Sequence, residues 1–178
     1  DLDRAGYFEV TALSRDDLSR NEMYKANLKR QNQEASFTDY HDYLLSLKMK
    51  AEILPFSPMY MARIAQLTNK SNQFNLTTLR CSQADIEQYA SDSSYITLYG
   101  KLEDCFGDNG VVSVVFGHVD AADSARFHID LWLMSCRVLK RNMEFAMMDS
   151  LAAACKKRGI RTILGYYYPT AKNKMVKD

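Results

Sequence analysis

The run Val111–Phe116 constrains the fold most, because five of its six residues are apolar and four are valine. A strand this apolar is typically buried on both faces, so we expect it at the centre of a sheet. Tyr95–Leu102 is a second β-rich run, and the turn-forming residues Gly107–Gly110 lie between the two. This order predicts a hairpin at the heart of the core.

A strand, a loop and a long helix are expected after the hairpin. Residues 127–134 alternate in polarity, which predicts a strand with Asp130 and Trp132 on the same face. Residues 143–158 carry apolar side chains at helical spacing, end in three basic residues and precede Gly159. Glycine is typical just after a helix C-terminus, and basic residues suit the last turn.

The remaining segments are expected to add edge strands and flanking helices. Residues 51–56 and 160–168 predict two further strands, the second with ordinary strand tyrosines at its end. Pro58 is placed to start a helix with Met59 on its buried face, and residues 83–90 predict a short helix. The expected fold class is α/β, with a mixed sheet flanked by helices.

The N-terminal residues 1–50 differ from the rest in being rich in Arg, Asp, Asn, Gln and Tyr. They predict a helix over 15–34 with a thin apolar stripe and a second helix capped by Thr38 or Asp39. We predict a helical linker at 1–50 and a separate domain at 51–178. A solvated helical hairpin without further function is the alternative for the linker.

Composition excludes several classes of function. The chain has 178 residues, of which 47% are hydrophobic, so a core can form. The 23 basic and 22 acidic residues give a net charge of +1, which predicts no nucleic-acid partner and no membrane partner. The four cysteines lack close paired spacing, so we expect no disulfide framework and no metal site.

The basic loop Ser135–Asn142 joins the predicted strand to the long helix. The first N–H groups of a helix lack internal partners and attract anions such as phosphate. An ordinary connection with solvated basic residues is the alternative. The residues that we predict to bind the phosphate end of a cofactor are Met134, Ser135, Arg137, Val138, Leu139, Lys140, Arg141 and Asn142.

Three other features are candidates for chemistry or substrate binding. Asp130 or His128 could act as a general base, although a satisfied polar pair is the alternative. Cys136 lies in this basic loop, where its thiolate is favoured, or it is a buried structural cysteine. The polar stretch Thr68–Thr78 predicts either hydrogen bonds to a substrate or a capped surface loop. Its candidate substrate-binding residues are Asn69, Asn72, Gln73 and Asn75.

Four segments carry a resemblance to a known family: Leu2–Glu9, Arg63–Thr78, Met134–Arg141 and Pro169–Asn173. They resemble FkbH-like proteins, which belong to subfamily IIIC of the haloacid-dehalogenase (HAD) type phosphatases. The resemblance extends over essentially the whole chain. The polar match within Arg63–Thr78 is the most specific part, since no general folding pattern requires it.

In that family an upstream HAD-type phosphatase-like domain precedes a domain similar to GNAT acetyltransferases. The resemblance implies that this chain is the linker plus the acetyltransferase-like half. It also implies that the C-terminal end of the acetyltransferase-like fold would follow Asp178. It also implies a cytoplasmic protein that handles an acyl unit, such as a glyceryl unit. Coenzyme A or the phosphopantetheine of an acyl carrier protein would carry that unit, and the strand ending near Met134 would offer backbone groups to the pantetheine arm.

The sequence departs from the family pattern at the phosphate loop. GNAT acetyltransferases have Gln/Arg-x-x-Gly-x-Gly/Ala there; Arg137 fits the first position, but Lys140 and Asn142 replace the two glycines. Asn173 matches the later helix start and is a further candidate cofactor residue, whereas the usual tyrosine acid would fall beyond Asp178. The alternative function is a non-catalytic docking module whose basic residues attract an acidic carrier protein.

Overall fold

The computed structural model describes residues 15–177, with side chains from Glu22 onward. The Leu2–Glu9 segment and the start of the expected linker lie outside the described residues. Two compact units make up the described chain: residues 15–48 with 105–107, and residues 49–104 with 108–177. Each unit is described by itself below.

The first unit contains the two predicted helices, α1 (Arg15–Glu34) and α2 (Tyr40–Ser46). Asp39 caps α2, because its carboxylate accepts backbone hydrogen bonds from the first turn, one of them at 2.6 Å. The Gln33 side chain donates to the Ser46 hydroxyl at 2.7 Å, which ties the two helices together. Both helices are therefore confirmed.

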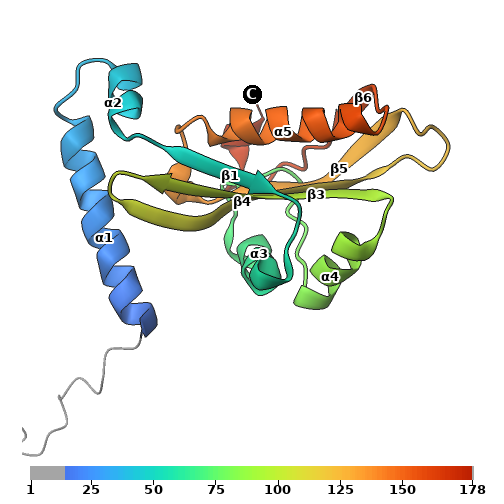
Figure 1. Cartoon of the computed structure of the whole chain (residues 1–178), viewed down its shortest axis with the longest axis horizontal. Helices are drawn as coiled ribbons and strands as arrows, with labels where there is room; N and C mark the ends of the chain where they lie inside the picture. The colour runs from blue at the N-terminus through green and yellow to red at the C-terminus, as the bar shows by residue number, and fades with distance from the viewer. Residues whose placement is uncertain (1–14, 178) are drawn as a thin grey trace, which may run out of the picture. The chain divides into compact units, whose positions relative to one another are not determined.

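The second unit is built on a six-stranded mixed sheet with the strand order β1-β3-β4-β5-β2, and β6 pairs with β5 as well (Figure 1). The predicted hairpin is formed by β3 and β4, and β4 lies inside the sheet as expected. The strands are β1 (Lys50–Leu54), β2 (Phe74–Asn75), β3 (Tyr95–Asp104), β4 (Gly107–Val119), β5 (Arg126–Met134) and β6 (Thr162–Gly165).

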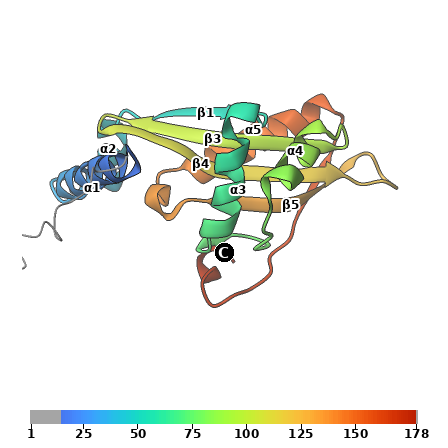
Figure 2. The same ribbon diagram turned by 90° about the horizontal axis from the view of Figure 1, so that it is seen from below.

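Helices cover both faces of the sheet (Figures 1 and 2). Helix α5 (Met143–Lys157) lies on one face, and α3 (Met61–Lys70) and α4 (Gln83–Ser91) lie on the other. A buried hydrophobic cluster fills each interface. The mixed α/β fold predicted from the sequence is thus confirmed. None of the helices among residues 15–177 is long and apolar enough to cross a membrane.

Helix α5 ends as the sequence predicted. Gly159 has a φ of 75°, a left-handed conformation that glycine adopts without steric cost. The backbone N–H of Gly159 donates to Lys156 and that of Ile160 donates to Cys155, which is the Schellman pattern. This ending turns the chain from α5 towards β6.

The predicted alternation along β5 is wrong beyond Ile129. Leu131 pairs with Phe116 while Ile129 pairs with Gly117, so Asp130 is an extra residue that forms a β-bulge. The bulge reverses the facing of the later residues, and Trp132 joins Ile129 on the α5 side. Asp130 and Trp132 therefore do not share a face.

Three local predictions also need correction. The hairpin turns at Cys105–Phe106, because Gly107–Gly110 already belong to β4. Met59 is 78% exposed, since the chain forms a short 3-10 turn (η2, Pro58–Tyr60) before α3 begins. Strand β6 has four residues, so the tyrosines that follow it are not part of the strand.

Candidate functional site

The outer edge of β5, opposite β4, has two different partners. Its first part, Arg126–Ile129, pairs in parallel with Thr162–Gly165 of β6. Its last part pairs antiparallel with β2, where Asn75 faces Leu133. Strand β6 ends where the bulge at Asp130 begins, so the sheet changes partner there. Two histidine–aspartate pairs, His118 with Asp130 and His128 with Asp120, lie near this point.

Asp130 and His118 form a close pair at the bulge. The His118 Nδ1 atom lies 2.9 and 3.0 Å from the two carboxylate oxygens of Asp130. The adjacent Tyr95 ring lies 5.9 Å from the His118 ring. Burial and the negative charge of Asp130 raise the pKa of Tyr95 to about 12. Tyr95 therefore stays protonated at neutral pH and can donate to Asp130.

His128 forms a second hydrogen-bonded chain with Asp120 and Tyr166. Its Nε2 atom lies 2.8 Å from Asp120, and its Nδ1 atom lies 2.6 Å from the Tyr166 hydroxyl. The hydrogen bond with His128, helped by backbone N–H donors, lowers the pKa of Asp120 to about 2. An ionised Asp120 accepts from Nε2–H, and in that tautomer Nδ1 accepts a hydrogen bond from the Tyr166 hydroxyl.

The two histidines lie against each other, with ring centroids 5.0 Å apart and an interplanar angle of 11°. A pocket of about 510 Å³ opens beside them. The residues that line it are Thr77, Leu79, Tyr89, Tyr95, His118, His128, Ile129, Asp130, Tyr166 and Tyr168. A cavity of this size can hold the end of a small acyl group together with an acceptor.

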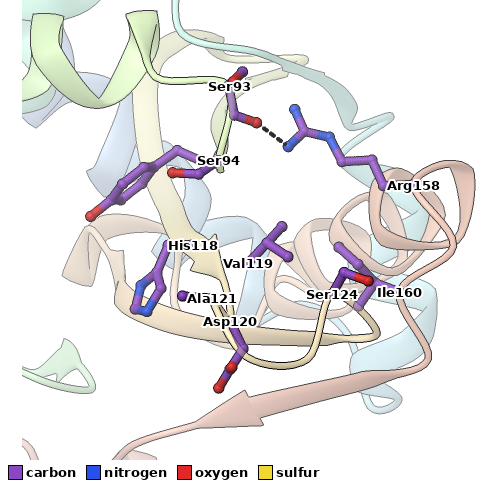
Figure 3. Close-up of a pocket in the computed structure, with 10 residues that line it drawn as sticks. Ser93, Ser94, His118, Val119, Asp120, Ala121, Ser124, Arg158 and Ile160 are labelled. Carbon is purple, nitrogen blue, oxygen red and sulfur yellow. Dashed lines mark hydrogen bonds between the residues drawn. The ribbon is translucent and has the colours of Figure 1, made fainter.

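A second pocket, of about 730 Å³, adjoins the first and is shown in Figure 3. His118 and Tyr95 line both pockets. On the far side from His118, the Arg158 guanidinium donates to the Ser93 carbonyl at 2.9 Å. The His118 side chain is 40% exposed, so its ring can be reached by a ligand.

This arrangement is suited to moving a proton. Asp130 accepts from Nδ1–H of His118 and thereby fixes the tautomer, which leaves Nε2 as the acceptor. A neutral imidazole held in this way can take a proton from an attacking hydroxyl, amine or thiol. The His118–Asp130 pair is therefore a candidate general base, and His128 holds Tyr166 beside it.

The structure brings some of the expected catalytic residues together. Asp130 and His128 both line the pocket, although each has a different partner. Cys136 is exposed, in the 3-10 turn η3 (Cys136–Val138), and is not among the residues lining this pocket. Its expected catalytic role remains a prediction.

The basic loop has an unusual backbone at the two positions where the resemblance predicts glycine. Lys140 and Asn142 have φ angles of 64° and 62°, so both adopt the left-handed conformation that glycine adopts without steric cost. The loop side chains, however, bind the protein itself. Arg141 donates to the fully buried Asp104 carboxylate at 3.1 Å, and Arg137 donates to Ser135 at 3.3 Å.

Other features of the loop also oppose a bound phosphate. Glu144 lies in the first turn of α5, and one of its carboxylate oxygens is buried without a hydrogen-bond partner among the described residues. This negative charge counteracts the helix dipole. Val138 is buried in the α5-side cluster and Leu139 packs against it, so they hold the loop on the core.

The candidate amide residues mostly bind backbone groups of the chain. Asn69 donates to the carbonyls of Ala65 and Cys81, at 2.9 and 3.1 Å. Asn72 accepts from Arg80, and Gln73 is exposed. Asn75 and Asn173 are fully buried. Their roles in binding substrate or cofactor remain predictions.

Sequence reasoning missed His118, Tyr95, Asp120 and Tyr166. A signal for His118 was present, because Gly117-His118 interrupts an otherwise apolar strand. A Cβ atom at Gly117 would lie 1.9 Å from the His128 carbonyl oxygen, so only glycine allows the two strands this close. The other three come from separate segments that only the fold brings together.

The resemblance to FkbH-like proteins implies a pantetheine-bearing cofactor, but the residues at the expected position do not fit one in this structure. The strand ending near Met134 was expected to offer backbone groups to the pantetheine arm. The Trp132 carbonyl accepts instead from Leu76 N–H at 3.0 Å, and the Asp130 carbonyl accepts from the Thr77 hydroxyl at 2.6 Å. The chain itself occupies these acceptors.

Comparison with solved structures shows that the chain has the fold of GNAT acetyltransferases. The ribosomal-protein-alanine N-acetyltransferase of Brucella melitensis aligns with a TM-score of 0.52 and 12% identity, over 68% of this chain and 82% of that one. AAC(6')-Iy, solved with a coenzyme A bisubstrate analogue, aligns with a TM-score of 0.53 and 10% identity, over 68% and 82%.

The ribosomal-protein-S18-alanine N-acetyltransferase of Escherichia coli aligns with a TM-score of 0.49 and 9% identity over 65% of this chain, and the match spans 66% of that enzyme. No family model matches the sequence, and the comparison with curated proteins found no match. The likeness therefore establishes the fold, while the resemblance to FkbH-like proteins remains a prediction.

Proposed function

We propose that this chain is the acyltransferase-like domain of an FkbH-like protein. It handles an acyl unit, such as a glyceryl unit, carried by coenzyme A or by the phosphopantetheine of an acyl carrier protein. The observation that carries the proposal is the His118–Asp130 pair at the bulge of β5, beside an open pocket in a GNAT fold. An upstream HAD-type phosphatase-like domain is the expected partner within the same protein.

In the proposed reaction, His118 acts as the general base. Its Nε2 atom takes the proton of the acyl acceptor as the acceptor attacks the acyl carbonyl carbon. The carbon–sulfur bond of the thioester then breaks, and the imidazolium returns the proton to the leaving pantetheine thiolate. Asp130 stabilises the imidazolium that forms, because its carboxylate already binds Nδ1–H. Tyr166, held by His128 at 2.6 Å, lies at the pocket wall and can orient the acyl group through its hydroxyl oxygen.

Kinetics with matched histidine variants test this proposal. The purified chain is incubated with an acyl carrier protein that bears a glyceryl thioester and with small alcohol, amine and thiol acceptors, and loss of the glyceryl group is followed by mass spectrometry. His118→Gln should lower kcat by about 10²–10⁴-fold, the usual contribution of a general base. His41→Gln is the control, because His41 is exposed on α2 and is not among the residues that line the pocket. Equal rates for both variants would reject the role of His118.

A non-catalytic docking module for an acyl carrier protein is the second candidate. The occupied outer edge of β5 favours it, because a domain that cannot bind the pantetheine arm along this strand cannot position the acyl thioester there for transfer. In this case the chain binds the carrier but accelerates no transfer, and His118→Gln leaves carrier affinity unchanged. Binding without transfer in the assay above would therefore favour docking over catalysis.

A further inference from the structure

Residues 74–77, here called the inserted segment, occupy the edge of β5 where the pantetheine arm was expected. Beyond Ile129, β5 has no parallel neighbour, because its pairing with β6 ends at Gly165. The inserted segment takes the vacant edge as an antiparallel strand, with Phe74 opposite Met134 and Asn75 opposite Leu133. It lies between β5 and the chain that follows β6.

The backbone of Leu76 bridges the two sides of this gap. Its N–H donates to the Trp132 carbonyl at 3.0 Å, and its carbonyl accepts from the Tyr168 N–H at 2.9 Å. The Thr77 hydroxyl adds a third bond, to the Asp130 carbonyl at 2.6 Å. A pantetheine arm carries two amide groups, so a peptide segment offers the same kind of donors and acceptors to a strand edge.

Buried asparagines hold the inserted segment in place. The Asn173 side chain is fully buried and donates to the carbonyls of Asn75 and Tyr168, at 2.8 and 3.0 Å. The Asn75 side chain is also fully buried and donates to the Ser71 carbonyl at 3.1 Å. Withdrawal of the segment would break the hydrogen bond between the Asn173 side chain and the Asn75 carbonyl and expose the buried Asn75 side chain, which is unfavourable.

Apolar packing holds the segment from the α5 side. The Phe74 ring meets the Trp132 ring edge to face, with centroids 5.6 Å apart. Phe74 and Leu76 both pack on the buried cluster between the sheet and α5. A competing ligand would have to replace the hydrogen bonds and this apolar contact together.

We propose that the inserted segment is a permanent structural replacement for the donor arm, so the chain does not bind coenzyme A along β5. The claim about coenzyme A does not depend on the proposed function; only the route of the acyl unit described next rests on it. The acyl unit must reach His118 through the open pocket, presented by a carrier protein whose docking surface supplies the affinity. The inference itself concerns binding of free coenzyme A and stands apart from the role of His118 in transfer.

Calorimetry and amide hydrogen exchange test the proposal on the whole chain. We expect no saturable binding of coenzyme A up to about 1 mM, a limit near the weakest useful affinity. We also expect the Leu76 and Tyr168 amides to be protected from exchange. Saturable binding that exposes these two amides to exchange would overturn the proposal.

A threonine variant tests whether the segment is docked in solution. Thr77→Val removes the hydroxyl that donates to Asp130 but keeps the shape of the side chain. Loss of one hydrogen bond should speed exchange of the Leu76 amide about fivefold. The Val114 amide, in the buried centre of β4, is the internal control and should exchange at its original rate. Unchanged exchange at Leu76 would also overturn the proposal.

Discussion

Replacing Asn75 by alanine should destabilise the protein strongly, because this side chain holds the turn before α4. Asn75 is fully buried, donates to the Ser71 carbonyl at 3.1 Å and accepts from the Thr78 N–H at 2.9 Å. Alanine leaves the Thr78 N–H unpaired and removes one of two hydrogen bonds to the Ser71 carbonyl, which also accepts from Arg80 at 3.3 Å. An unpaired buried polar group costs about 1–3 kcal/mol, so we expect a loss of about 1–3 kcal/mol.

Urea denaturation followed by tryptophan fluorescence measures this loss. Trp132 is the only tryptophan, and its contact with Phe74 makes it sensitive to the inserted segment. Gln73→Ala is the matched control, since Gln73 is exposed in the same stretch and should change stability by less than about 0.5 kcal/mol. If Asn75→Ala and Gln73→Ala were equally stable, the structural role assigned to Asn75 would be wrong.

Three further predictions follow from the geometry. Gly117→Ala should destabilise the protein by about 1–3 kcal/mol in urea denaturation, whereas Gly165→Ala, with open space around its Cβ position, should not; equal effects would refute the close approach at the bulge. Asp120, whose pKa is lowered to about 2, should stabilise the fold above about pH 4 and lose that effect as the pH falls towards 2. The stability difference between the parent and Asp120→Asn should shrink over this range, and a constant difference would contradict it. Iodoacetamide should label exposed Cys105 and Cys136 well before Cys81 and Cys155, because burial raises the pKa of both latter thiols to about 11. Peptide mass spectrometry would show the reverse order if this were wrong.

The sequence predicted the parts of the fold that depend on local periodicity. The long helix α5, the hairpin with its buried second strand and the helix α1 all follow from apolar spacing and turn residues. The two-residue strand β2 could not be predicted in this way. Its residues Phe74–Asn75 lie in a polar stretch, and only the vacant edge of β5 makes them a strand.

The candidate site was predictable only in part, for a related reason. Asp130 and His128 lie on one strand, so their proximity could be inferred from the sequence. The partners of these residues come from other elements, and no local pattern links His118 on β4 with Tyr166 after β6. The bulge at Asp130 could not be predicted either. The sequence of β5 alternates regularly through Asp130, and only its pairing with β4 shows that this residue is an extra one.

The most direct test of the proposed function is an NMR titration of the labelled chain with an acyl carrier protein, with and without a glyceryl-loaded arm. If the acyl unit enters the pocket, the ring signals of His118 and His128 should shift only with the loaded carrier. The backbone amides of Leu76 and Tyr168 should stay unchanged, since the inserted segment remains bound to β5. Equal shifts with loaded and unloaded carriers, or none at either histidine, would contradict acyl handling at this site.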